Sequence, residues 1–65
     1  MDELKYKKMW EELKRRVEQL REYNRARKEG CIKEGEYALA CTYSDWAIED
    51  TAILGIMKKL EEEVD

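Results

Sequence analysis

The chain has 65 residues and a formal net charge of −3, and 45% of its residues are charged. A chain of this length forms one domain at most, and small folds usually need disulfides, a metal or oligomerisation to be stable. Histidine is absent and only two cysteines are present, which disfavours a zinc site and a disulfide framework and leaves oligomerisation as the expected source of stability.

Membrane and secretory segments are not expected. No run approaches the roughly 18 apolar residues that a membrane span needs. The N-terminal residues lack the apolar core of a secretory signal, and two cysteines without a framework suit a reducing compartment. We therefore predict a cytoplasmic protein with no membrane partner.

The first half of the chain carries a heptad pattern, which is typical of a helix that packs along its length on other helices. Its members recur at alternating steps of four and three: Tyr6, Trp10, Leu13, Val17, Leu20, Asn24 and Arg27. No helix-breaking residue occurs before Gly30, and glycine commonly follows the end of a helix. We predict a helix over about residues 3–29.

A short connection follows this helix. Gly30 and Gly35 bracket a segment of ordinary length for joining two antiparallel helices. We therefore predict a connection over about residues 30–35.

The remaining residues repeat the heptad pattern and predict a second helix over about residues 36–64. The members of this pattern are Leu39, Tyr43, Trp46, Asp50, Ile53, Met57, Leu60 and Val64. Thr42 and Ser44 are good N-cap residues. An alternative is therefore a helix that restarts near residues 42–44 after a short first piece.

The second stripe is broad, because Ala47, Leu54 and Ile56 flank it, and one partner helix cannot cover its width. The predicted fold is therefore all-α: an antiparallel helical hairpin that dimerises into a four-helix bundle. Two registers are compatible with the hairpin. The preferred one pairs Leu13 with Asp50, and the other is shifted by one heptad and turns nearer Gly35.

Three polar residues interrupt the patterns, and one of them, Arg27, lies near the end of its helix and can extend to water. Asn24 at a core position is a device that fixes register and oligomeric state at some cost in stability. Asp50 is expensive to bury alone. We expect it to be hydrogen-bonded, with Arg16 or Lys14 as its basic partner, or to contact water.

Catalytic equipment is missing from the sequence. Without histidine there is no ordinary base to activate Cys31 or Cys41, and no glycine-rich phosphate loop is present. We predict a protein that is not an enzyme, with no catalytic residues, no cofactor and no metal.

The predicted function is that of a small acidic protein–protein interaction module that associates with itself, as a homodimer, and that can take another protein as partner. An inhibitor or adaptor encoded by a phage or mobile element would fit the small size. The candidate interface residues are Trp46, Leu54, Ile56, Met57, Tyr23 and Tyr37.

A basic edge on the first helix supports an alternative function. Its residues are spaced by seven: Lys7, Lys14, Arg21 and Lys28. Such an edge either flanks a helical core and pairs with acidic residues, or contacts the phosphates of RNA or DNA. Glutamates interleave with it, namely Glu11, Glu18, Glu22 and Glu29. These favour the first interpretation over nucleic-acid binding.

Overall fold

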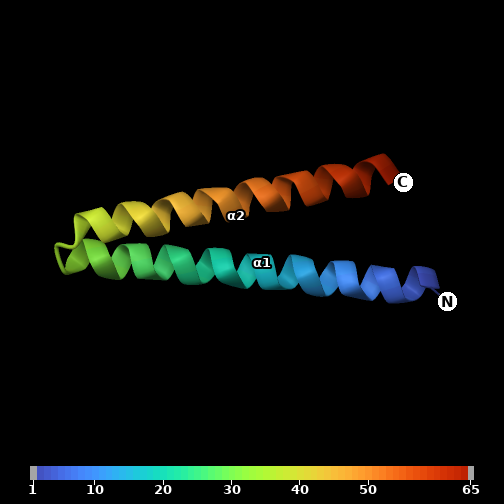
Figure 1. Ribbon diagram of the computed structural model, residues 1–65, viewed down its shortest axis with the longest axis horizontal. Coiled ribbons are helices and arrows are strands. Elements are labelled where there is room, and N and C mark those ends of the chain that lie inside the picture. The colour runs from blue at the N-terminus through green and yellow to red at the C-terminus, as the bar shows by residue number, and fades with distance from the viewer. Residues whose placement is uncertain (1, 65) are drawn as a thin grey trace.

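The structure is a computed structural model that describes residues 2–64 as two long helices in an antiparallel hairpin (Figure 1). Helix α1 spans Asp2–Lys33 and helix α2 spans Tyr37–Val64. The hairpin is elongated, with principal extents of 51 × 19 × 11 Å. The helices pack on each other, which confirms the predicted helical hairpin.

The turn between the helices is shorter than predicted. The connection over residues 30–35 is wrong, because α1 continues through Gly30 and only residues 34–36 join the helices. Gly35 donates its N–H to the Ile32 carbonyl at 3.1 Å, and Glu36 donates to the Cys31 carbonyl at 2.8 Å. Gly35 has a φ of +78°, the left-handed conformation in which a glycine closes a helix with this pair of bonds.

Helix α2 is continuous, so the alternative of a break near residues 42–44 is wrong. The helix begins after Glu36, whose carbonyl accepts the N–H of Ala40 at 3.0 Å. The Thr42 hydroxyl donates to the Ala38 carbonyl one turn earlier, at 3.4 Å. Its side chain therefore bonds back into the helix, which is the role of a threonine in a helix interior, and caps no new helix.

Only alternate members of the predicted heptad on α1 face α2. Trp10, Val17 and Asn24 are half-buried or buried, whereas Leu13 and Leu20 are 52% and 50% exposed. The residues that follow these leucines and Arg27 face α2 instead and are half-buried: Lys14, Arg21 and Lys28. The predicted helix is therefore correct in type but rotated about its axis.

Helix α2 is rotated in the same sense. Tyr43, Asp50 and Met57 face α1 as predicted. The members between them are between 41% and 48% exposed: Leu39, Trp46, Ile53 and Leu60. The residues that follow these four turn towards α1 and are buried or half-buried: Ala40, Ala47, Leu54 and Glu61.

The interior of the hairpin is thin. The buried residues are Asn24, Cys31, Ala40, Ala47, Asp50 and Met57, and no described side chain is less than 2% exposed. A single hairpin therefore covers one edge of the broad apolar stripe that the sequence predicts.

Three contacts between the helices fix their register. Lys14 binds Glu61 at 2.9 Å, Asn24 binds Asp50 at 2.8 Å, and the Arg27 guanidinium lies over the Tyr43 ring. The preferred register, which paired Leu13 with Asp50, is wrong. The chain turns at Gly35, as in the register shifted by one heptad. That register would pair Leu13 with Met57, however, and Leu13 is 52% exposed whereas Met57 is buried against α1.

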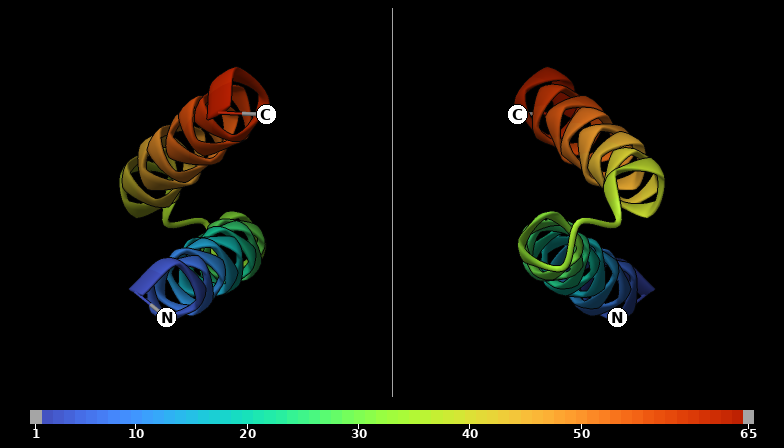
Figure 2. Two further views of the ribbon diagram at one scale, coloured as in Figure 1. Left: turned by 90° about the vertical axis from the view of Figure 1, so that its right-hand side faces the viewer. Right: turned by 90° about the vertical axis from the view of Figure 1, so that its left-hand side faces the viewer.

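The two helices are closest at the turn and move apart towards their free ends (Figures 1 and 2). We call the end near Gly35 the closed end and the other the open end. A hollow of about 680 Å³ lies between the helices at the open end, lined by Lys7, Trp10, Glu11, Leu60, Glu61 and Val64. The helices therefore diverge around this hollow at the open end and lie closer together near the turn.

Candidate interaction surface

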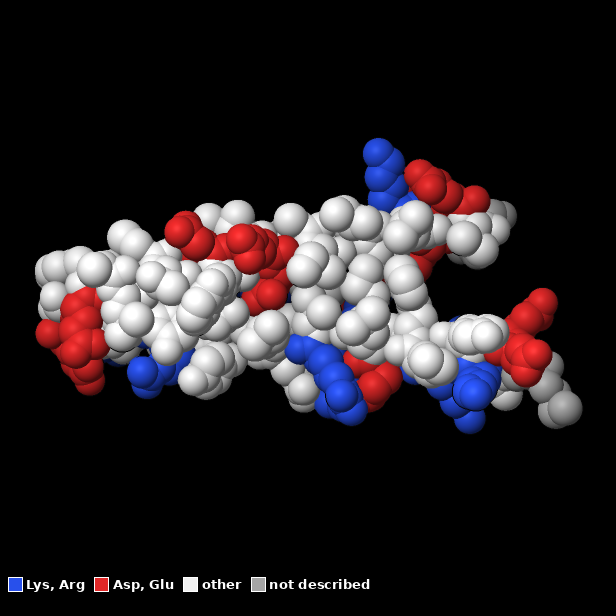
Figure 3. Space-filling view, viewed as in Figure 1, with Lys and Arg blue, Asp and Glu red and all other residues white. Residues whose placement is uncertain are grey.

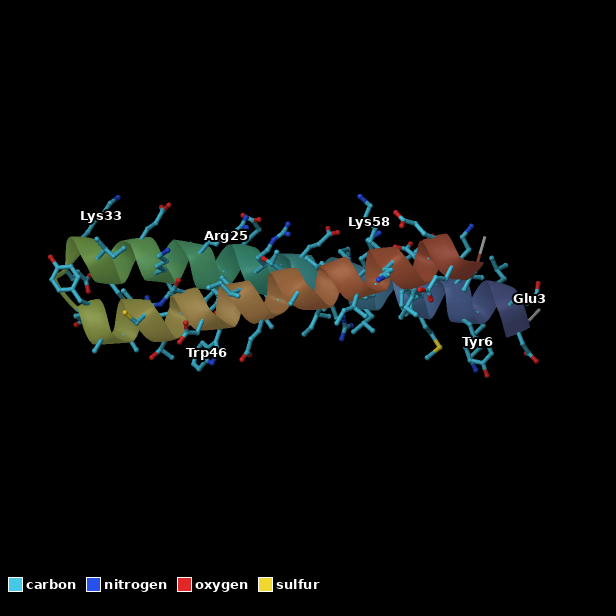
Figure 4. All side chains as sticks on the ribbon, turned by 90° about the horizontal axis from the view of Figure 1, so that it is seen from above. Glu3, Tyr6, Arg25, Lys33, Trp46 and Lys58 are labelled. Atoms are coloured by element: carbon cyan, nitrogen blue, oxygen red, sulfur yellow. The ribbon has the colours of Figure 1, made fainter. Side chains whose placement is uncertain are left out.

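Both helices direct apolar side chains to the same side of the hairpin, here called the apolar side. Its members are Tyr6, Leu13 and Leu20 of α1 and Leu39, Trp46, Ile53 and Leu60 of α2, all more than 40% exposed. Trp46 and Tyr6 project to this side, and Arg25, Lys33 and Lys58 project to the opposite one (Figure 4). Seen from the apolar side, uncharged atoms extend across both helices and most charges lie at the margins (Figure 3).

The rotation of the helices produces this surface. Each heptad stripe consists of two parallel rows of residues. The contact between the helices uses one of these rows, for example Trp10, Val17 and Asn24 of α1, together with polar residues on its far flank such as Lys14 and Arg21. The second row of each helix is left on the same side. Met9, Tyr23 and Ile56, which are more than half exposed, lie one step further round and widen the apolar side.

An aromatic cluster joins the helices on the apolar side near the closed end. The Arg27 guanidinium carbon of α1 lies 5.5 Å from the centre of the Tyr43 ring. The Tyr43 ring meets the Trp46 ring edge to face, with centres 5.4 Å apart and planes at 87°. Such contacts have preferred geometries and hold Trp46 in place while half of it stays exposed.

The centre of the hairpin contact is polar. The Asn24 side-chain amide donates to the Asp50 carboxylate at 2.8 Å, and the two residues are 3% and 6% exposed. The expected basic partner of Asp50 is therefore wrong: Lys14 binds Glu61, and Arg16 binds Glu12 on its own helix. The pair joins α1 to α2 at one height and disfavours sliding of one helix along the other.

The basic edge of α1 lies mostly against α2. The Lys14 ammonium donates a hydrogen bond to Glu61 and so lowers the pKa of that carboxyl. Arg21 is half-buried, with a buried Nε that lacks a hydrogen-bond partner and lies 3.7 Å from Glu22. Lys28 is half-buried, and Lys7 is exposed at the hollow.

The predicted interface residues are divided between the two kinds of surface. Trp46, Ile56, Tyr23 and Tyr37 are exposed. Met57 is 4% exposed and Leu54 is half-buried, so both face α1 inside the hairpin.

Sequence reasoning placed six further residues of the apolar side on the heptad patterns inside the hairpin: Tyr6, Leu13, Leu20, Leu39, Ile53 and Leu60. The signal that could have corrected this is the pair Ala40 and Ala47, seven residues apart on the flank of the stripe. Small residues at that spacing let α1 approach closely, and both are buried against it.

The described residues form neither a cluster of metal-binding side chains nor a helix that could cross a membrane. Within residues 2–64, no three side chains of the metal-binding types lie close enough to hold an ion. Neither α1 nor α2 contains a segment long and apolar enough to cross a membrane.

Glu12 titrates at low pH. It accepts hydrogen bonds from Arg15 and, at 2.9 Å, from Arg16, and these lower its pKa from 4.5 to about 2. Because the folded-state pKa is depressed, the associated stabilisation is present above pH 4.5 and is lost as the pH falls through about 2. Carbon-detected NMR titration should report this pKa. In an Arg15→Ala, Arg16→Ala variant we expect it to return towards 4.5, and an unchanged value would contradict the assignment.

No protein-family model matches the sequence, and no curated protein or solved structure is significantly similar to it. A functional role is therefore inferred from the surface and contacts of the hairpin itself.

Proposed function

We propose that this chain is a non-enzymatic protein–protein interaction module whose partner is a second copy of itself. The two copies bury their apolar sides against each other and form a four-helix bundle. The observation that carries the proposal is the shared direction of the unused heptad rows, Leu13 and Leu20 on α1 with Trp46, Ile53 and Leu60 on α2. Helices in such bundles pack on neighbours along both flanks around a common core, and one hairpin supplies only one of these contacts.

The exposed area supports a second copy as the partner. The hairpin exposes 5523 Å². A compact monomer of 7.8 kDa is expected to expose about 4,400 Å². The excess, about 1,100 Å², resembles the roughly 800 Å² that each partner buries in a stable complex.

The thin interior also supports self-association. Two alanines, one cysteine and one methionine are the buried apolar residues of the hairpin. Full burial of a large apolar side chain contributes about 1.5–3 kcal/mol, so covering a half-exposed one contributes roughly 1 kcal/mol. The apolar side offers several such side chains from each copy, which would raise a marginal stability to that of an ordinary small domain.

Nucleic-acid binding through the basic edge has less support. Phosphate contacts need cationic groups that are free to meet the backbone. Lys14 is engaged by Glu61, and Arg21 and Lys28 are half-buried beside α2. A cytoplasmic location and a role as an inhibitor or adaptor rest on the sequence alone.

Sedimentation equilibrium at micromolar concentration tests the proposal. We expect a mass of twice 7.8 kDa, with helicity and mass falling together on dilution. A fully helical monomer at these concentrations would contradict self-association. Tight binding to RNA or DNA that weakens steeply with salt would instead favour the basic edge as the functional surface.

A further inference from the structure

We infer that the two copies pack with their closed ends at opposite ends of the bundle, so that the twofold axis crosses the bundle at Leu20 and Ile53. This inference rests on the proposed self-association and specifies its geometry. The alternative is a bundle in which both turns lie at the same end.

Three levels along the apolar side carry one residue from each helix, with Tyr6 beyond them at the open end and Leu39 beyond them at the closed end. Arg27 and Trp46 both contact or flank the Tyr43 ring and define the closed-end level. Leu13 and Leu60 directly precede the ion pair of Lys14 and Glu61 and define the open-end level. Leu20 and Ile53 are seven residues from the members of both and form the middle level.

The largest side chains of the three levels lie where the two helices are closest, and the smaller ones lie where the helices are furthest apart. The closed-end level carries a tryptophan and an arginine where the helices are closest (Figure 1). The open-end level carries two leucines where the helices diverge around the hollow. With both turns at one end, two bulky levels would meet at the narrow end and two leucine levels at the wide end, which combines overpacking with a cavity.

With the turns at opposite ends, each bulky level meets the leucine level of the other copy. Trp46 and Arg27 of one copy then lie opposite Leu60 and Leu13 of the second copy, where the helices leave room. Large and small side chains alternate across the core, as close packing requires. The middle level meets itself, four apolar side chains of similar size.

Charge favours the same arrangement. With both turns at one end, Arg27 of each copy would enter a single level of the core, and two like charges would be desolvated together. With opposite turns, the two Arg27 side chains are separated by two heptad steps along the bundle, one on either side of the middle level. Each then keeps its stacking contact with Tyr43 of its own chain.

The test is a distance between spin labels at the closed ends of the two copies, measured by pulsed dipolar EPR. The label is attached at Glu36→Cys in a Cys41→Ser background, since Cys31 is 3% exposed and shielded from the reagent. Glu36 lies 17 residues from Ile53, so opposite turns predict a separation of about 50 Å at 1.5 Å per residue. Turns at one end predict under about 30 Å, because neighbouring helix axes are only 8–10 Å apart.

Gln19→Cys in the same background is the matched control. Gln19 is exposed and lies beside the middle level, so its label reports a distance under about 30 Å in either bundle. The Cys41→Ser protein alone should take up no label. Glu34→Cys, also in the turn, provides a second closed-end site should Glu36→Cys disturb the start of α2.

The long closed-end distance with the short Gln19 distance supports opposite turns. A short distance at both sites overturns the inference and leaves the dimer standing. No dipolar distance at either site, with a monomer mass in the ultracentrifuge, overturns the proposed function and the inference with it.

Discussion

Ile53→Asp is expected to convert the proposed dimer into a monomer, whereas Ile48→Asp should leave the association unchanged. Ile53 lies in the middle level of the apolar side, where a second copy would cover it. Ile48, on the same helix, is 63% exposed and lines a hollow with Arg25, which projects to the side opposite the apolar side (Figure 4). A carboxylate buried at an interface without a partner costs several kcal/mol, so we expect at least a 100-fold rise in the dimer dissociation constant for Ile53→Asp.

The matched pair separates a buried interface from a general effect of charge on helix α2. Both variants add the same charge to a partly exposed isoleucine on one helix, and sedimentation equilibrium measures each dissociation constant. Equal effects at the two positions would mean that the apolar side is not the contact surface.

Asn24→Ala is expected to destabilise the hairpin by about 2–3 kcal/mol, since hydrogen bonds to charged groups contribute about 1.5–3 kcal/mol. The variant removes the donor that binds Asp50 at 2.8 Å and leaves that carboxylate buried. Urea denaturation followed by circular dichroism measures the free energy of unfolding. A loss below 1 kcal/mol would show that water satisfies Asp50 equally well.

Two further variants define what the pair does. Asp50→Asn keeps an oxygen that can accept the Asn24 bond, so we expect a smaller loss than for Asn24→Ala. Replacing both residues by leucine removes the buried polar groups that need hydrogen-bond partners, so we expect the stability to be preserved or raised. The double variant should lose definition of the register, seen as broadened NMR resonances near the pair, because its core no longer distinguishes one heptad alignment from the next.

The helices could be predicted from the sequence because most local signals agree. Gly35 ends α1 through a backbone conformation that glycine favours, and the heptads run on either side of it. Gly30 misled the prediction, because a glycine inside a long helix reduces stability by only about 1 kcal/mol and the rest of α1 compensates for it. The sequence alone does not show which of the two glycines, Gly30 or Gly35, has a positive φ.

The rotation of each helix could not be predicted in the same way. Leu13 and Lys14 are adjacent in sequence, yet Lys14 faces α2 and Leu13 does not. A heptad pattern identifies the apolar stripe of a helix but does not show which edge of the stripe contacts which neighbouring helix. Pairing Lys14 with Glu61 requires knowledge of the register, which follows from the position of the turn. The residues predicted for the interface are therefore divided: Trp46 is 48% exposed on the apolar side, whereas Met57 is 4% exposed and faces α1.

The brevity of the turn has a consequence for kinetics. Only residues 34–36 separate the helices, so the chain entropy lost on closing the hairpin is small. Helix formation and closure of short loops take about a microsecond or less. Two copies that associate at about 10⁵–10⁷ M⁻¹s⁻¹ need roughly 0.1–10 s to meet at micromolar concentration. For a self-associating hairpin, the slow step of folding is therefore bimolecular, and its observed rate rises in proportion to the concentration of protein.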